Sequence, residues 1–328
     1  MLIYYHLNDH YPENIIPNTY ETYERVKSIL NRLNDDDNNT FVNMTVLKDL
    51  SEATKLYELL VDIHGLEYVN WLFHINETIS TDVFRPKCSF KSPVPQDMKS
   101  RLSCYSFDST TPVNGSTFKA AFMSAFCAYE AAKSIIKDQK VCYALSRPPG
   151  HHASREQLGG YCYFNNAFVA AKILYDKTKK KISILDVDYH HGNGTQELVY
   201  FDENYQYISI HEFDNEPWTG YTQENKGFRI YNLPIEKPIT EDKYTEKLKL
   251  AILAIKDFNP GFLIVSFGAD TYKGDPLISK GSGLSIEYYS LMGNIINQLN
   301  LKTLIVQEGG YNINALGSCV FNFLNSFK

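Results

Sequence analysis

Two aspartates and two histidines fall within six positions of the segment LDVDYHHGNGTQE, which covers residues 185–197. Asp188 and His190 are two positions apart, and side chains at that spacing point to the same side of an extended chain. Asp270, which follows another apolar run, can supply a third ligand. Carboxylate oxygens and an imidazole nitrogen suit a catalytic Zn²⁺ that keeps its remaining coordination open to water and substrate. The alternative for Asp188 and His190 is a hydrogen-bonded pair in a loop.

Two adjacent histidines, His151 and His152 in RPPGHHA, are candidates for proton transfer. Beside a metal, two imidazoles can activate water and return the proton to a leaving group. Asp186 and Asn193 are their candidate partners, because a carboxylate raises the basicity of a bonded imidazole and an amide leaves it lower. A surface pair or one satisfied core histidine is the alternative, and the stiff turn of the preceding Pro-Pro-Gly counts against it.

Tyr311, in the segment EGGYN, is the candidate electrophile. Gly309 and Gly310 allow a close approach of the backbone, so the phenol can point at a carbonyl oxygen that develops negative charge. The alternative is an ordinary tyrosine in a glycine-rich turn, because the chain contains 24 tyrosines.

All these residues lie in loops that directly follow predicted strands. The loops are RPPGHHA (147–153), DVDYHHGNG (186–194), GADTYKGDPL (268–277) and EGGYN (308–312). Short runs rich in Val and Ile alternate with helical segments, which predicts an α/β fold with a mostly parallel central sheet and helices on both faces. In such sheets the ligand crevice lies beyond the carboxyl ends of the strands. We therefore expect the four loops to converge on one site.

The predicted elements fill most of the chain. Strands are expected at 2–5, 141–145, 182–188, 206–211, 229–233, 262–267 and 303–307. Helices are expected at 19–33, twice within 50–78, at 117–136, 165–177, 240–257 and 285–299, and at the end of the chain. Residues 34–40 read as a polar loop, and residues 79–117 as a long irregular segment, which is usually functional or disordered.

Composition narrows the class of protein. The chain has 328 residues, of which 44% are hydrophobic and 21% charged, as in globular proteins. A net charge of −6 argues against a nucleic-acid binder. Six cysteines without a CxxC pair indicate a reduced set and a cytoplasmic protein. We find no signal peptide and no apolar run long enough for a transmembrane helix.

Taken together, the motifs resemble those of the zinc-dependent histone deacetylase superfamily, and are most similar to its acetylpolyamine amidohydrolase branch. The matching segments occur in order over about 105–328: YSFDSTTPVNGSTF, RPPGHHA, GGYCYFNNA, LDVDYHHGNGTQE, SIH, FGADTYKGDPL and QEGGYN. The resemblance implies one arginase/deacetylase-type α/β domain over residues 1–328. It assigns Asp188, His190 and Asp270 to Zn²⁺, with Fe²⁺ as the other possible native metal.

The resemblance also implies the surroundings of the metal. It pairs His151 with Asp186 and His152 with Asn193. It further implies a structural monovalent cation, usually K⁺, held by backbone oxygens and one hydroxyl. The matching positions are the backbone oxygens of Asp186, Asp188 and His190, the Ser209 hydroxyl and the Ile210 carbonyl.

The substrate tube is the part where this chain departs from the family pattern. Tyr161 and Leu277 match its walls, and the Gly160 carbonyl is placed to accept the substrate amide N–H. In FDNEPW (213–218), Glu216 stands where an aromatic residue is expected, next to Trp218. Glu216 near the mouth of the tube either attracts a cation or faces solvent. Residues 79–104 lie where the acetylpolyamine branch narrows its site through dimerisation, so a homodimer is possible.

The expected function is hydrolysis of the acetyl amide of an acetylated primary amine, with release of acetate. Acetyl-lysine in a protein or peptide and an N-acetylpolyamine are both open as substrates. The alternatives are a binding module for acetylated partners and a hydrolase of another acylated amine. The dimanganese ureohydrolases share the fold but need additional bridging aspartates, and GADT supplies only one.

Overall fold

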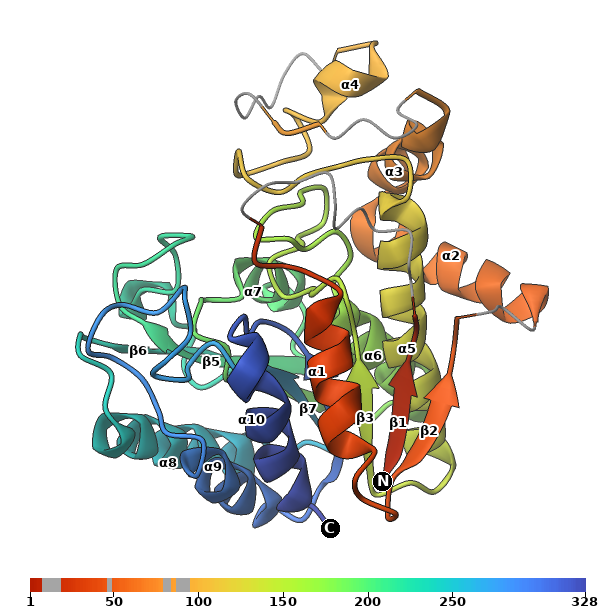
Figure 1. Cartoon of the computed structure of the whole chain (residues 1–328). Coiled ribbons are helices and arrows are strands. Elements are labelled where there is room, and N and C mark those ends of the chain that lie inside the picture. Colours follow the sequence, from red (N-terminus) through yellow and green to blue (C-terminus); the bar gives the residue numbers. More distant parts are fainter. Residues whose placement is uncertain (8–18, 46–48, 79–83, 87–94) are drawn as a thin grey trace.

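The core of the protein is one eight-stranded sheet in which every pairing is parallel (Figure 1). The computed structural model describes residues 1–7, 19–45, 49–78, 84–86 and 95–328. The strand order is β2-β1-β3-β8-β7-β4-β5-β6. The strands are β1 (Leu2–Tyr5), β2 (Thr40–Asn43), β3 (Val141–Leu145), β4 (Ile182–Asp186), β5 (Tyr205–Glu212), β6 (Ile230–Ile235), β7 (Phe262–Phe267) and β8 (Lys302–Gln307). The predicted parallel α/β sheet is confirmed.

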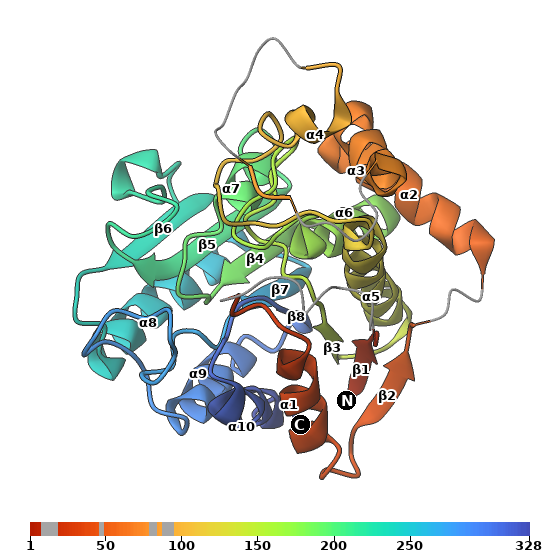
Figure 2. The ribbon, with the colours of Figure 1, turned by 45° about the horizontal axis from the view of Figure 1, so that its top comes forward.

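Helices cover both faces of this sheet, as Figure 2 shows. One face carries α2 (Leu50–His64), α3 (Leu66–Thr78), α5 (Thr117–Lys137) and α6 (Asn166–Thr178). The other carries α1 (Glu24–Leu33), α8 (Glu241–Phe258), α9 (Tyr288–Asn297) and α10 (Ile313–Asn325). Successive strand residues point to opposite faces, so Ile184 packs in the first core and Leu185 in the second. Burial on both faces explains why the central strands are continuous apolar runs.

Several predicted elements differ from the observed ones. The first helix begins at Glu24 instead of residue 19, and α9 is shorter at both ends than the predicted 285–299. Strand β2 was missed because TFVN is short and not fully buried, so it lacks an apolar signature. Helix α7 (Asn193–Val199) was missed because it begins with Asn-Gly, a pair typical of turns. The segment read as irregular contains the four-residue helix α4 (Met98–Arg101).

Other expectations from composition can be compared with the described residues. There, no helix is both long enough and apolar enough to cross a membrane. Cys104, Cys127, Cys142, Cys162 and Cys319 are buried, and no disulfide joins any two of these five. Cys88 and much of the proposed dimerisation segment, residues 79–83 and 87–94, lie outside the described residues.

A buried histidine at the end of α2 makes the stability of the fold depend on pH. Asn165, the residue that caps α6, donates its backbone N–H to Nε2 of His64 at 3.0 Å. Nδ1 of His64 therefore carries the proton and donates to the Ser154 carbonyl at 2.7 Å. Burial lowers the pKa of His64 from 6.5 to about 4, because a second proton would face the N–H of Asn165 without solvation.

We predict that His64→Gln makes the free energy of unfolding less dependent on pH between 6.5 and 4. The unfolded chain binds a proton at His64 below pH 6.5, whereas the folded chain binds it only near pH 4. The stabilisation by neutral His64 is therefore complete above pH 6.5 and is lost as the pH falls toward 4. The loss amounts to about 3 kcal/mol by pH 4. Urea unfolding of both proteins at several pH values measures the slope, and identical slopes would contradict the assignment.

Candidate active site

The four motif-bearing loops follow four adjacent strands, β3, β8, β7 and β4, at the middle of the sheet. Parallel strands end at the same edge, so the loops meet there, and the predicted convergence is confirmed. The loops border a cavity of about 650 Å³. Its lining residues are Phe107, Asp108, Ser109, Thr110, His152, Gly160, Tyr161, His190, Asn215, Glu216, Pro217, Trp218, Leu277 and Tyr311.

Three potential metal ligands lie together beside this cavity, and one of them, His190, lines it. One ligand atom from each of Asp188, His190 and Asp270 lies within 4.8 Å of the other two. His190 Nδ1 is 3.3 Å from Asp188 Oδ1 and 3.1 Å from Asp270 Oδ2. Backbone N–H groups orient the carboxylates, since Gly309 donates to Asp188 at 2.8 Å and Tyr189 donates to Asp270 at 3.1 Å.

The surroundings of this triad fit a divalent cation. Both carboxylates are buried, and burial followed by the charge of Asp188 raises the pKa of Asp270 to about 7. Two buried like charges need a positive partner. Glycines make room for the cluster: a Cβ at Gly268 would lie 2.0 Å from Asp188 Oδ2, and one at Gly309 would lie 2.4 Å from Asp270 Oδ2. Oxygen and nitrogen donors in this number are those of catalytic zinc sites.

The two histidines have different hydrogen-bond partners and opposite pKa shifts. His151 Nδ1 lies 3.1 Å from Asp186 Oδ2, and His152 Nδ1 lies 2.7 Å from Asn193 Oδ1, at the start of α7. Burial alone would lower the pKa of His151, but the charges of Asp188 and Asp186 outweigh it and raise this pKa to about 10. Burial and then the positive charge of His151 hold the pKa of His152 well below 6.5. Both predicted hydrogen bonds are present, and His152 is the neutral imidazole that lines the cavity.

The ring of Tyr311 lines the cavity beside Tyr161, with 6.1 Å between the two ring centroids. Its backbone N–H donates to Asp275 at 2.6 Å, and the preceding Gly310 adopts a φ of +117°, which a side chain would disfavour. Arg25 on α1 stacks on the ring at 4.7 Å and donates from Nε to the Gly310 carbonyl at 2.7 Å. Tyr311 is therefore positioned by the hydrogen bond of its backbone to Asp275, by the conformation of Gly310 and by the contact of its ring with Arg25.

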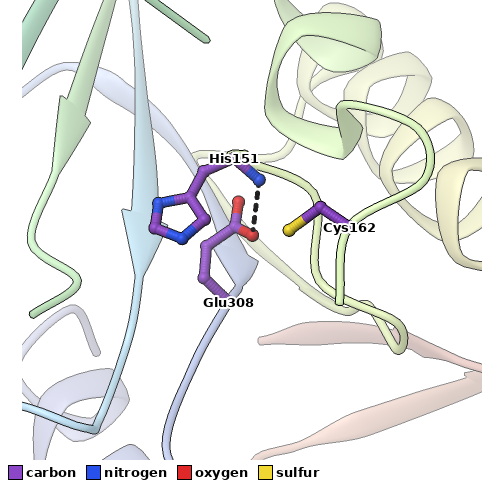
Figure 3. A group of neighbouring side chains, drawn as sticks. All are labelled: His151, Cys162 and Glu308. Carbon is purple, nitrogen blue, oxygen red and sulfur yellow. Dashed lines mark hydrogen bonds between the residues drawn. The ribbon is translucent and has the colours of Figure 1, made fainter. Parts of the chain in front are cut away.

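A buried glutamate, Glu308, binds the backbone of the loop 147–153 that carries His151 (Figure 3). Its Oε2 accepts N–H groups of Gly150 at 2.6 Å and His151 at 3.1 Å, and its Oε1 accepts the Ser266 hydroxyl at 3.1 Å. The thiol of Cys162 points toward the same carboxylate, and His151, Cys162 and Glu308 form a second close group of possible ligands. Because the carboxylate already accepts three hydrogen bonds, we assign Glu308 to positioning His151.

One wall of the cavity is built from a backbone stretch with positive φ angles, at Gly160 (+54°) and Tyr161 (+65°). A Cβ on Gly160 would lie 2.2 Å from the His152 ring, so only glycine fits against this imidazole. The Gly160 carbonyl accepts the thiol of Cys162 at 3.4 Å. Phe107 and Asp108 complete the wall and were not predicted as site residues, although they lie in a motif that was recognised.

The other predicted residues are found at two places. Leu277, Glu216 and Trp218 line the cavity, as expected for substrate-binding residues, while their roles stay predictions. Of the predicted K⁺ positions, Asp186 of β4 pairs in register with Ser209 of β5, and His190 lines the cavity. The Ser209 hydroxyl is within 2.8 Å of His211 Nδ1, and the K⁺ site also stays a prediction.

The site combines two buried histidines that have different partners, a phenol and a group of potential metal ligands. This combination is suited to attack by an activated water on a carbonyl. The fold and the site thus define a metal-dependent hydrolase of the α/β class. The histone deacetylase domain matches residues 19–327, so the chain belongs to this family of metal-dependent deacetylases. The predicted family and fold class are confirmed.

Similar proteins agree with the resemblance seen in the motifs. The chain is 32% identical over 289 residues to acetylpolyamine amidohydrolase 1 of Pseudomonas aeruginosa, covering 83% of each chain. It is 33% identical to the acetylpolyamine amidohydrolase of Mycoplana ramosa, covering 81% of this chain and 82% of that one. The crystal structure of acetylpolyamine aminohydrolase from Burkholderia pseudomallei superposes with a TM-score of 0.88 at 27% identity, covering 100% of this chain and 98% of that chain.

Proposed function

We propose that this protein hydrolyses the acetyl amide of an acetylated primary amine and releases acetate. The observation that carries the proposal is the unequal histidine pair, His151 with Asp186 and His152 with Asn193, beside the metal triad. Tyr311 borders the same cavity as His152. A water activated by a base and a donor for the developing oxyanion are the two groups that amide hydrolysis needs.

The metal of this site is proposed to be Zn²⁺, with Fe²⁺ as the alternative, held by Asp188, His190 and Asp270. When bound, the ion would polarise the acetyl carbonyl and lower the pKa of water. The second ion would be K⁺, held by backbone oxygens of Asp186, Asp188 and His190, the Ser209 hydroxyl and the Ile210 carbonyl.

The chain's own residues then move the protons. Because Nδ1 of His152 donates to Asn193 Oδ1, its Nε2 carries the lone pair that accepts a proton from the attacking water. Asp188 and Asp186 raise the pKa of His151, so its protonated form can stabilise negative charge, and either His151 or His152 can protonate the leaving amine. The Tyr311 hydroxyl donates to the oxygen of the former carbonyl as it gains charge.

Small acetylpolyamines are the substrates that we propose, with acetyl-lysine peptides as weaker ones. The cavity is lined by two carboxylates, Asp108 and Glu216, and by no Lys or Arg among the residues that the structure describes. Such a lining favours a substrate with a positive charge of its own. The relatives named acetylpolyamine amidohydrolases support the same class.

We expect N-acetylputrescine and N-acetylspermidine to exceed an acetyl-lysine peptide in kcat/KM by about ten-fold or more, equivalent to about 1.4 kcal/mol. Steady-state hydrolysis by zinc-loaded protein measures this ratio. A preference for the peptide would instead make the chain a protein deacetylase. No turnover of any of the three would contradict the proposed function.

A further inference from the structure

We propose that Glu216 and Trp218 form a subsite for the distal ammonium group of a diamine or polyamine substrate. This inference rests on the proposed function, because it assigns a specificity-determining subsite of the same cavity. The sequence left two possibilities for Glu216, attraction of a cation or exposure to solvent. The contacts around the two carboxylates that line the cavity, Asp108 and Glu216, favour attraction of a cation by Glu216.

Asp108, the first of these carboxylates, forms hydrogen bonds within the protein through both of its oxygens. Its Oδ1 accepts the backbone N–H groups of Thr110 and Thr111, each at 2.9 Å. Its Oδ2 accepts the Thr111 hydroxyl at 2.7 Å and the Gly160 N–H at 2.6 Å. With both oxygens bonded twice, Asp108 holds the wall at Gly160 and has little capacity left for a ligand.

Glu216, the second carboxylate, is available. Within the described parts of the chain it accepts no hydrogen bond and forms no ion pair, although it lines the cavity. Its side chain is exposed, so its carboxylate is accessible to a ligand. An ammonium group in the cavity would therefore find in Glu216 a carboxylate that does not have to break existing contacts.

Trp218 supplies the second half of the subsite. It lines the same cavity, yet 61% of this large apolar side chain is exposed. An indole face attracts a cation, and Trp is the best of the aromatic residues for this interaction. The backbone N–H of Trp218 donates to the Asn215 carbonyl at 2.7 Å and closes a tight turn around Glu216. The side chains of Glu216 and Trp218 therefore lie on one short segment.

Hydrogen bonds to His191, His211 and Glu224 hold the turn in place. His191 Nδ1 lies 2.7 Å from the Thr219 hydroxyl, and His211 Nε2 lies 3.0 Å from the Gly220 carbonyl. Glu224 accepts the Gly220 N–H at 2.9 Å. A fixed turn lowers the entropy lost on binding, so the subsite is preorganised.

The burial of the cavity residues sets the direction of the substrate. His152 and Tyr311 are buried and lie at the closed end, whereas Glu216 and Trp218 are exposed and lie at the open end. A linear amine with its acetyl amide at His152 would extend its far end toward Glu216. The subsite thus selects for a second positive charge on the substrate.

The test compares N-acetylputrescine with N-pentylacetamide, which has the same length but carries a methyl in place of the ammonium. The ratio of their kcat/KM values measures recognition of the charge. We expect Glu216→Gln to lower this ratio by about five-fold, mainly through the KM of N-acetylputrescine, since an exposed ion pair is modest in strength. We expect added salt to lower the ratio in the wild-type protein and to have less effect in Glu216→Gln.

Asp214→Asn is the matched control, because Asp214 is an exposed acid on the same segment that does not line the cavity. It changes the net charge equally and should keep the wild-type ratio. Equal ratios in Glu216→Gln and wild type, or an equal fall in both variants, would overturn the subsite. Turnover of neither substrate by wild type would contradict the proposed function instead. In that case, calorimetric binding of N-acetylputrescine decides: equal affinity for wild type and Glu216→Gln overturns the subsite, and weaker binding to the variant supports it.

Discussion

Replacing Tyr311 by Phe lowers kcat by about 100-fold or more, while KM changes little. The hydroxyl donates to an oxygen that becomes negatively charged only as the reaction proceeds, so its loss costs about 3 kcal/mol in the transition state. The ring keeps its place because the backbone of Tyr311 is bonded to Asp275 and its face is covered by Arg25. Steady-state kinetics with N-acetylputrescine measures both constants.

Tyr272→Phe is the control for this substitution. Tyr272 lies two positions after Asp270 and does not line the cavity, so losing its hydroxyl should leave kcat close to the wild-type value. Thermal unfolding of both variants checks that the fold is intact. Near-normal turnover by Tyr311→Phe would remove the tyrosine from the proposed mechanism.

Removal of the metal should abolish activity, and Asp270→Ala should do so without a chelator. A metal that activates water contributes several kcal/mol, so we expect kcat to fall on the order of 1,000-fold or more. The ion also neutralises two buried carboxylates, Asp188 and Asp270, so zinc should raise the Tm of the metal-free wild-type protein. Zinc should raise the Tm of Asp270→Ala much less.

Asp257→Ala, on the exposed side of α8, is the matched control and should bind one equivalent of zinc as the wild-type protein does. Elemental analysis of each protein gives its metal content. Full activity of a wild-type sample shown to be metal-free would contradict the assignment of the triad. An unchanged zinc content in Asp270→Ala would exclude Asp270 as a ligand.

Residues with a local signal were predictable from the sequence. Asp188, His190, His151 and His152 follow apolar runs that end in polar loops, and the structure brings them to one edge of the sheet. The alternation of strands and helices was sufficient for the fold class. The order of the strands was not predictable, because it depends on which strands pair and not on any single segment.

Residues that act through distant partners were missed. Arg25 is an amphipathic-helix residue whose contact with Gly310 spans 285 positions. Glu308 was read only as part of the EGGYN segment, and its contact with Gly150 spans 158 positions. Arg25 also pairs with Glu21 four residues earlier, but the contacts that connect Arg25 and Glu308 to the site reach residues far away in the sequence. The segment around Glu216 stands out in the sequence because it departs from the family pattern. That Glu216 forms no hydrogen bond or ion pair with the described part of the chain became clear only from the structure.

The most direct test of the account is the release of acetate from N-acetylputrescine by zinc-loaded protein, measured together with the free diamine. We predict one acetate for each putrescine formed, with turnover lost on chelation and restored by zinc. A protein that holds one zinc per chain and yet releases no acetate from this substrate, from N-acetylspermidine or from an acetyl-lysine peptide would contradict the deacetylase assignment.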